Sequence, residues 1–503
     1  MDLYELISIS LYFILMVVIG FYAYIKSTAN TEEFLLGGRK MGAAVTALSA
    51  GAADMSGWLL MGLPGAMYIS GLSASWIAIG LTLGAYLNYL YIAPRLRIYT
   101  ELAGNSITLP VFFENRFQDQ SRLLRIISSV LILIFFTLYT SAGMVSGGRL
   151  FEFAFGMHYN VGLCVTSLVV VVYTFLGGFL AVSLTDFVQG TIMVLALVTV
   201  PIVAVVILGG PIDTLEIIEN KNDTYLNLFT GTTAVSILSL LCWGLGYCGQ
   251  PHILVRFMAI DSVKDLIKAR RIGISWMIFT VGGALLVGLI GIAYLHKYDV
   301  DSMMIFDSSK EKAETIFIYF ARVLFHPLIS GFLLSAILAA VMSTISSQLL
   351  VTSSSITEDV YKAFINKKPT EKQAMIVSRL SVLGVAILAF ILSLTPRDSI
   401  LNLVGNAWAG FGATFGPLII LSLFWKRTNV WGALAGMLTG GISVLVWVYA
   451  GLYAKTGIYE IIPSFFLSLV MIIIISLCTE KPKKEIIDTY DKMDVELEEK
   501  YKN

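Results

Sequence analysis

The sequence has little charge for its length. Only 14% of its 503 residues are Asp, Glu, Lys or Arg, and their charges cancel, whereas soluble domains usually carry about 25% charged residues. Hydrophobic residues make up 57% of the chain, and the mean hydropathy is +0.81. This composition excludes a soluble enzyme and a disordered protein, because neither class carries so much apolar material.

Cysteine and histidine are also scarce. Each occurs four times, and neither shows the short spacing of a zinc or haem site. We interpret Cys164, Cys242, Cys248 and Cys478 as small packing residues. The sequence also lacks a GxxxxGK[ST] loop, which excludes a pump driven by nucleotide hydrolysis.

Long apolar runs, in contrast, fill most of the chain. A membrane-spanning helix needs roughly 20 apolar residues, and 13 segments of spanning length can be marked off. The first begins without the basic residues of a signal peptide, so we expect it to remain in the protein. The predicted fold is an all-α polytopic membrane protein. Its predicted spans are residues 4–25, 42–70, 73–94, 126–148, 160–183, 187–210, 232–257, 272–295, 327–355, 376–395, 399–425, 430–452 and 458–479.

Lys and Arg are unevenly distributed among the predicted loops. The loops after odd-numbered spans, together with their adjoining helix ends, hold 20 of them, and the loops after even-numbered spans hold 8. Because Lys and Arg collect in cytoplasmic loops, we predict a cell-membrane protein with its N-terminus outside and its C-terminus in the cytoplasm. The charged tail, residues 480–503, is expected to be solvated and either disordered or loosely helical.

Two predicted spans contain small and helix-breaking residues near their centres. The second holds residues 51–58, and the seventh holds residues 243–251. Each begins a group of five spans, and paired interruptions of this kind indicate inverted repeats around a site at the bilayer midplane. The predicted organisation is a first span and loop (1–41), two repeats (42–210 and 211–425), two further spans (426–479) and the tail (480–503).

An interrupted helix leaves main-chain carbonyl and amide groups without partners, which costs several kcal/mol per group in lipid. Freed carbonyls suit a small cation, and the N-terminus of a half-helix suits a carboxylate. Asp54 supports a functional site, because an ionisable side chain at this depth is costly. Ser343 and Thr344 in the ninth span offer two hydroxyl oxygens. The simpler alternatives are that the glycines only allow close helix packing and that the hydroxyls only bond to their own helix.

Five stretches of the chain resemble one known family. The run Asp-Met-Ser-Gly-Trp at 54–58 is highly specific, and the run Gly-Gly-Phe-Leu at 177–180 marks the wider family. With these residues the chain resembles the sodium:solute symporter family, and within it the sodium/proline symporters of bacteria, along residues 1–480. The stretches that carry the resemblance are 35–39, 47–65, 173–182, 243–252 and 335–344.

The resemblance implies a LeuT-type core of five plus five inverted spans, with discontinuous helices in spans 2 and 7. It implies sodium as the coupling ion and no other cofactor. Asp54 matches the carboxylate that family members need for sodium-dependent uptake, and Arg39 and Asp186 match charged positions linked to ion coupling. The implied sodium ligands are the carbonyls of Ala52, Met55 and Ala340 and the hydroxyls of Ser343 and Thr344.

The resemblance also implies a substrate site for L-proline. Trp58, Tyr139 and Trp243 offer apolar walls and cation–π contact to a ring that carries an ammonium group. Ala53 and Cys248 differ from the residues of some relatives. Both adjoin the implied site, so we expect the affinity for substrate to differ from that of those relatives. The implied substrate residues are Ser56, Gly57, Trp58, Tyr139, Trp243 and Tyr247.

The expected function is secondary transport, in which sodium moves down its gradient and carries L-proline into the cell by alternating access. The expected partners are proline, sodium and the lipid bilayer, without nucleic acid or an obligate protein partner. The alternative cargo is another small solute or osmolyte. A membrane enzyme would need a second polar partner near Asp54, and a transporter-like sensor would need a signalling domain larger than the tail.

Overall fold

The computed structural model describes residues 2–27, 31–299, 310–396 and 398–502. Over these residues the chain is helical, and strand pairing is limited to one isolated bridge between Met41 and Ile260. Ten helices of the described chain are long and apolar enough to cross a membrane. The predicted all-helical, multi-pass class is therefore confirmed.

The long helices follow the predicted apolar runs, and shorter helices connect them. The long ones and the segments that complete them are α1 (Leu3–Ser27), α3 (Ala43–Asp54), η2 (Trp58–Gly62), α4 (Leu63–Ser70), α5 (Ser75–Leu87), η4 (Asn88–Ile92), α6 (Ala93–Leu102), α8 (Leu123–Phe155), α9 (Tyr159–Leu208), α11 (Ala234–Leu241), η6 (Cys242–Gly249), α12 (Pro251–Ala259), α13 (Asp265–Lys297), α16 (Pro327–Ser354), η8 (Ser355–Ile365), α17 (Glu371–Ser393), α18 (Ile400–Phe424), α19 (Val430–Tyr449) and α21 (Ile461–Cys478). The connecting helices are α2 (Thr31–Leu36), η1 (Gly37–Arg39), α7 (Leu109–Phe117), α10 (Pro211–Lys221), α14 (Lys310–Ala313), α15 (Ile316–Val323), α20 (Leu452–Thr456) and α22 (Lys484–Leu497).

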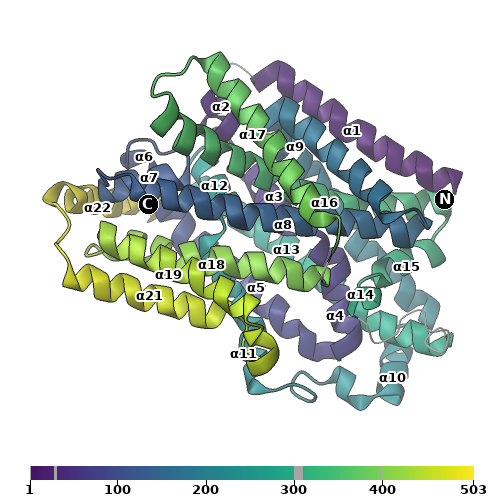
Figure 1. The fold of residues 1–503 in the computed structure, drawn as a ribbon. Coiled ribbons are helices and arrows are strands. Elements are labelled where there is room, and N and C mark those ends of the chain that lie inside the picture. The colour runs from purple at the N-terminus through teal and green to yellow at the C-terminus, as the bar shows by residue number, and fades with distance from the viewer. Residues whose placement is uncertain (1, 28–30, 300–309, 397, 503) are drawn as a thin grey trace.

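The helix α16 lies at the centre of the bundle. It packs against α1, α3, α8 and α9, and every residue over 333–350 is buried. The helix α1 runs along one edge beside α9, whereas α19 and α21 run along the opposite edge, next to α18 (Figure 1). A helix that is apolar around its whole circumference is typical of such a central position.

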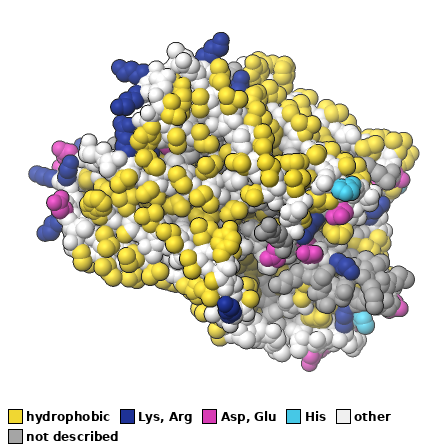
Figure 2. Space-filling model, in the orientation of Figure 1, with side chains coloured by type: hydrophobic (Ala, Val, Ile, Leu, Met, Phe, Trp, Pro, Cys, Tyr) yellow, Lys and Arg dark blue, Asp and Glu magenta, His cyan; other side chains and the backbone are white. Residues whose placement is uncertain are grey.

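The outer surface is apolar over much of its area. Leu11, Ile14 and Val18 on α1 are each more than half exposed, as expected of side chains that contact lipid. Figure 2 shows hydrophobic side chains across the middle of the visible face, with Lys and Arg gathered toward the end that holds α22 in Figure 1. This distribution agrees with a bundle whose middle is surrounded by lipid.

The bend between the fifth and sixth predicted spans lies earlier than predicted. The sequence pattern places a boundary between residues 183 and 187, but the chain turns at Gly178 (φ 56°, ψ −146°) inside α9. A Cβ at this position would overlap the side chain and the carbonyl of Phe34. Only glycine fits there, and the bend escapes hydropathy because no polar loop accompanies it.

The tail is a docked helix, which corrects the expectation of a solvated segment. Tyr490 of α22 donates a hydrogen bond of 3.0 Å to the carbonyl of Leu423, and Asp494 forms an ion pair of 2.6 Å with Arg95. The spacing of its apolar residues places one face of the helix against the bundle. The buried residues of that face are Ile486, Tyr490, Met493 and Leu497.

Candidate functional site

The helix α3 ends in the middle of the second predicted span. Met55 leaves helical geometry (φ −82°, ψ 74°), and the amide of Ser56 donates to the carbonyl of Asp54 at 3.0 Å. In a continuous helix that amide would donate to the carbonyl of Ala52. The break therefore frees the Ala52 carbonyl for another partner.

That partner comes from α16. Ser343 Oγ donates to the Ala52 carbonyl at 2.7 Å, and Thr344 Oγ1 lies 3.4 Å from it. Both hydroxyls also lie 3.1 Å from the carbonyl of Ala340. The structure thus gathers four of the five residues proposed as sodium ligands, all fully buried, while Met55 lies at the break itself.

These oxygens are chemically suited to a small hard cation. Carbonyl and hydroxyl oxygens are the ligands that hard cations prefer. The hydroxyls of Ser343 and Thr344 currently donate to carbonyls, but a hydroxyl can rotate its proton away and present a lone pair. The cluster is built from two separate helices, so its geometry depends on how α3 sits against α16.

Asp54 links the break in α3 to η6. Its side chain is 2% exposed, and its Oδ2 accepts a hydrogen bond from the hydroxyl of Tyr247. Its Oδ1 has no hydrogen-bond partner among the described residues, and no Lys, Arg or His of that part of the chain lies within ion-pair distance. A buried carboxylate without a positive partner is costly.

A second interruption lies in the seventh predicted span. Cys242–Gly249 (η6) has 3₁₀ geometry, and Gln250 is extended (φ −84°, ψ 106°) before α12 begins. Gly244 lies against the backbone of Gly80 in α5, where a Cβ would not fit. Asn88 Nδ2 donates to the Tyr247 carbonyl at 3.1 Å, which satisfies one of the groups that the irregular geometry frees.

The proposed substrate residues form two groups. Trp58 Nε1 and the Tyr139 hydroxyl lie 3.4 and 3.5 Å from the Asp54 carbonyl, and the buried Ser56 hydroxyl beside them has no described partner. Trp243 is separate from this group and stacks on Tyr459, with ring centroids 5.0 Å apart and an interplanar angle of 18°. Gly57 packs so closely on Ser146 of α8 that a Cβ would overlap it.

Asp186 belongs to a buried charge cluster beneath α3. Its Oδ2 accepts from Ser49 Oγ at 2.7 Å and from Arg256 Nη2 at 3.3 Å, and Arg256 also donates to Ser347 Oγ at 2.6 Å. Both ionic side chains are fully buried. Arg256, which the count of Lys and Arg took from the end of the seventh predicted span, lies inside α12. The signal for its burial was an isolated charge at the end of an apolar run.

Arg39 lies in a different polar cluster. It donates to the Asn105 side chain at 2.9 Å and to the carbonyls of Ser106 and Met258 at 2.7 Å each. These bonds tie η1 to the connection between α6 and α7 and to the end of α12. The structure gives Arg39 an anchoring geometry, and its link to ion coupling stays a prediction.

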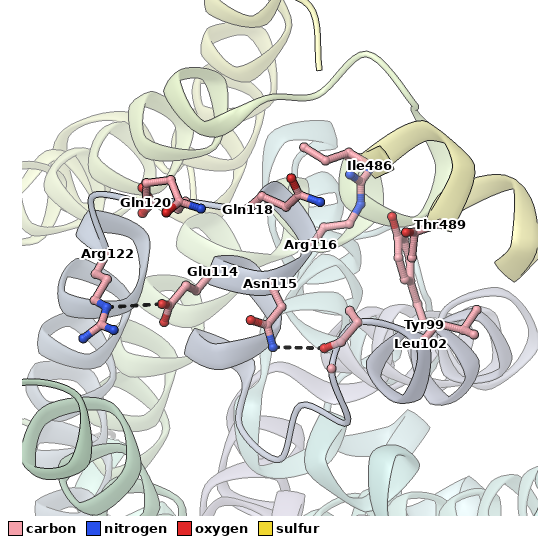
Figure 3. Close-up of a pocket in the computed structure, with 13 residues that line it drawn as sticks. Tyr99, Leu102, Glu114, Asn115, Arg116, Gln118, Gln120, Arg122, Ile486 and Thr489 are labelled. Carbon is pink, nitrogen blue, oxygen red and sulfur yellow. Dashed lines mark hydrogen bonds and ion pairs between the residues drawn. The ribbon is translucent and has the colours of Figure 1, made fainter. Parts of the chain in front are cut away.

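A pocket of about 450 Å³ lies apart from these residues, beneath α22 (Figure 3). Arg116 lines it, with its guanidinium 5.1 Å from the centroid of the Tyr99 ring and its Nε donating to the Ser422 carbonyl at 3.1 Å. Burial lowers the pKa of Arg116. None of the residues proposed for sodium or substrate lines this pocket, so it is not the candidate site.

The chain is similar to a known protein family and to proline transporters of bacteria. Residues 34–440 match the family model described as "Sodium:solute symporter family". The chain is 58% identical over 484 residues to the osmoregulated proline transporter OpuE of Bacillus subtilis, covering 96% of each chain. It is 55% identical over 476 residues to the high-affinity proline transporter PutP of the same organism, covering 95% of this chain and 98% of that protein.

A solved structure shares the fold. A Na⁺-coupled sialic acid symporter, in a substrate-bound outward-open state, aligns with a TM-score of 0.78. The alignment covers 96% of this chain and 99% of that chain, at 19% sequence identity. At this identity the likeness concerns the arrangement of the helices and not the cargo.

Proposed function

Since this chain belongs to the sodium:solute symporter family, we propose that it carries L-proline into the cell together with sodium. The observation that carries the proposal is the meeting of the freed Ala52 carbonyl with the hydroxyls of Ser343 and Thr344. Two relatives that match almost the whole chain are named as proline transporters, and this supports the choice of cargo.

The proposed architecture has 13 spans in a LeuT-type arrangement. Spans 2–6 and 7–11 form the two inverted repeats, and the breaks at residues 55–57 and 242–250 occupy corresponding positions in them. The N-terminus lies outside and the C-terminus lies in the cytoplasm. The excess of Lys and Arg in and beside the loops after odd-numbered spans supports this orientation.

Sodium binds, in this proposal, at the carbonyls of Ala52, Met55 and Ala340 and the hydroxyls of Ser343 and Thr344. The ion replaces the hydrogen bonds that these hydroxyls now donate, and it joins α3 to α16 by ligand bonds. Asp54 supplies negative charge nearby without a competing positive side chain. A cation therefore lowers the cost of burying the Asp54 carboxylate.

Proline binds beside the same break. Its carboxylate meets the main-chain amides and the Ser56 hydroxyl at the start of η2, where a half-helix presents its positive end. Trp58 and Tyr139 flank the ring and its ammonium group, and Tyr247 closes the site from η6. Residues 52–58 thus contribute to both sites, and this is the proposed structural cause of coupling.

Alternating access requires the two repeats to move against each other. The hydrogen bond from Tyr247 to Asp54 joins the two interrupted helices, so we propose that it rearranges in each transport cycle. Asp186 and Arg256 form a buried pair beside α3, and they hold α9 against α12 during this movement. In this proposal Asp186 and Arg39 influence coupling by holding neighbouring helices in place, and they do not bind sodium or proline themselves.

The decisive experiment is uptake of labelled L-proline into proteoliposomes that contain the purified protein and an imposed inward sodium gradient. The proposal predicts accumulation with sodium and none when potassium replaces it. Unlabelled proline should compete, whereas a sugar or a monocarboxylate should not. Sodium-driven uptake of a different solute, with no competition by proline, would retain the symporter and reject the cargo.

A further inference from the structure

A cavity of about 460 Å³ lies where α11, η6, α18 and the α19–α21 connection meet. Trp243 of η6 forms part of its lining, together with Tyr459 and Glu460 just before α21. This end of the bundle is the one that the charge distribution predicts to face outward. The cavity therefore lies directly outside one of the proposed substrate residues.

Trp243 and Tyr459, which stack on each other, both line this cavity. The Tyr459 hydroxyl donates to the Gly405 carbonyl at 2.6 Å, and its amide donates to Ser239 Oγ at 3.1 Å. Trp447 Nε1 donates to the Ile458 carbonyl at 3.1 Å. Residues 457–460 are thus held across α11 and α18 by bonds to both, so the aromatic pair has a defined position.

Glu460 contributes an unpaired charge to the lining. Its residue is only 3% exposed, and within the described part of the chain no Lys, Arg or His forms an ion pair with it. The other lining carboxylate, Asp398, already accepts from Asn402 Nδ2 at 2.9 Å and from the Ser399 amide at 2.7 Å. Glu460 is therefore a buried carboxylate without a positive partner among the described residues, which is a costly arrangement.

We propose that this cavity is an outer binding position for the zwitterionic substrate, where Glu460 takes the ammonium group before the substrate passes the Trp243–Tyr459 stack. The inference rests on the proposed function, and it adds a residue that determines uptake at low substrate concentration. The indole and phenol faces provide the apolar wall that the substrate ring requires.

The chemistry of the cavity favours an organic ammonium over sodium. Sodium is hard and takes oxygen ligands on several sides, as the Ala52 and Ser343 cluster provides. Here a single carboxylate without an ion-pair partner shares the lining with aromatic rings and the Asn406 amide. An ammonium group carried on an apolar body matches both parts of such a lining.

The test is Glu460→Gln in proteoliposomes, assayed for sodium-driven uptake of labelled proline. Loss of the charge should raise KM for proline by roughly 10- to 150-fold at external pH 8, as for one charge-assisted hydrogen bond. The maximal rate and the sodium concentration for half-maximal uptake should not change. Glu216→Gln is the matched control, because Glu216 is an exposed carboxylate on α10 outside the cavity.

External pH separates a charge effect from a packing effect. A protonated Glu460 is itself neutral, so the native protein should approach Glu460→Gln in KM as the external pH falls from 8 to 5.5. The other titratable groups that line the cavity are Asp398, Tyr453 and Tyr459, and both proteins contain them. Asn406→Asp, which returns a carboxylate to the wall, should lower KM in the Glu460→Gln background.

Three outcomes overturn the inference. They are an unchanged KM in Glu460→Gln, a changed sodium requirement at constant KM, and an equal effect of Glu216→Gln. Each of these leaves proline uptake by the native protein intact. Failure of the proposed function would instead appear as an absence of proline uptake by the native protein in the same vesicles.

Discussion

Ser343 Oγ donates a hydrogen bond of 2.7 Å to the main-chain carbonyl of Ala52, across the contact between α16 and α3. The two residues are 291 positions apart in the chain. The bond exists because Ser56 turns its amide to Asp54 and so leaves Ala52 without its helical donor. A side-chain donor now occupies the place where the proposed ion would bind, and this relationship leads to the first prediction.

Removal of the hydroxyl of Ser343 or of Thr344 should weaken the binding of sodium. Ser343→Cys and Thr344→Val keep the approximate volume but lose a hard oxygen ligand, so the sodium concentration for half-maximal uptake should rise on the order of 10-fold for each. Thr352→Val is the control, since Thr352 donates its hydrogen bond to the Gln348 carbonyl of its own helix. Unchanged sodium dependence in the double variant would show that these hydroxyls serve only helix packing.

Asp54→Asn should abolish sodium-stimulated uptake of proline. The substitution keeps the size of the side chain and a group able to bond Tyr247, but it removes a buried negative charge that has no described positive partner. Tyr247→Phe, which keeps the charge and removes its donor, should retain sodium dependence at a reduced rate. Near-normal sodium stimulation in Asp54→Asn would exclude Asp54 from the ion pathway.

Sodium and proline should each strengthen the binding of the other, because coupling between two sites is reciprocal. Residues 52–58 contribute to both proposed sites, so we expect a coupling of roughly 1–3 kcal/mol, or about 5- to 150-fold in affinity. Titration of the purified protein with proline, at zero and at saturating sodium, measures it. Equal affinity in both titrations would contradict sodium-coupled proline binding.

Trp243→Ala should weaken proline binding and leave sodium binding without proline nearly intact. An indole is an apolar wall and not a ligand for a hard cation, and Trp243 contacts Tyr459 rather than the Ala52 cluster. Separate titrations with each ligand distinguish the two effects. A comparable loss of sodium affinity would mean that the substitution disturbs η6 as a whole.

The tail helix α22 should detach from the bundle more readily when a buried side chain of its docked face is shortened. Met493 of α22 is fully buried, and Met493→Ala should cost about 2 kcal/mol or more of docking free energy. Limited proteolysis of the purified protein should then cleave 484–497 faster. Val495→Ala is the control, because Val495 is 56% exposed; equal cleavage of both variants would show that the helix does not depend on this face.

The helical class and the regions of both interruptions follow from local patterns. Apolar runs of spanning length predict spanning helices because unpaired backbone groups are too costly in lipid. The runs around Asp54 and from Trp243 to Pro251 stand out because glycine, proline and charge are unusual there. The same reasoning identified Ser343 and Thr344, whose hydroxyls lie beside small residues.

Only the tertiary structure decided which residues meet at the candidate site, since the members of each contact are distant in sequence. No local pattern shows that Ser343 meets Ala52, that Asp186 pairs with Arg256, or that Tyr459 stacks on Trp243. Hydropathy also cannot distinguish a charge at the end of a span from a charge buried inside the bundle, because both end an apolar run. The cost of burying Arg256 is met only by an acceptor on another helix, and that partner exists only after the helices have packed.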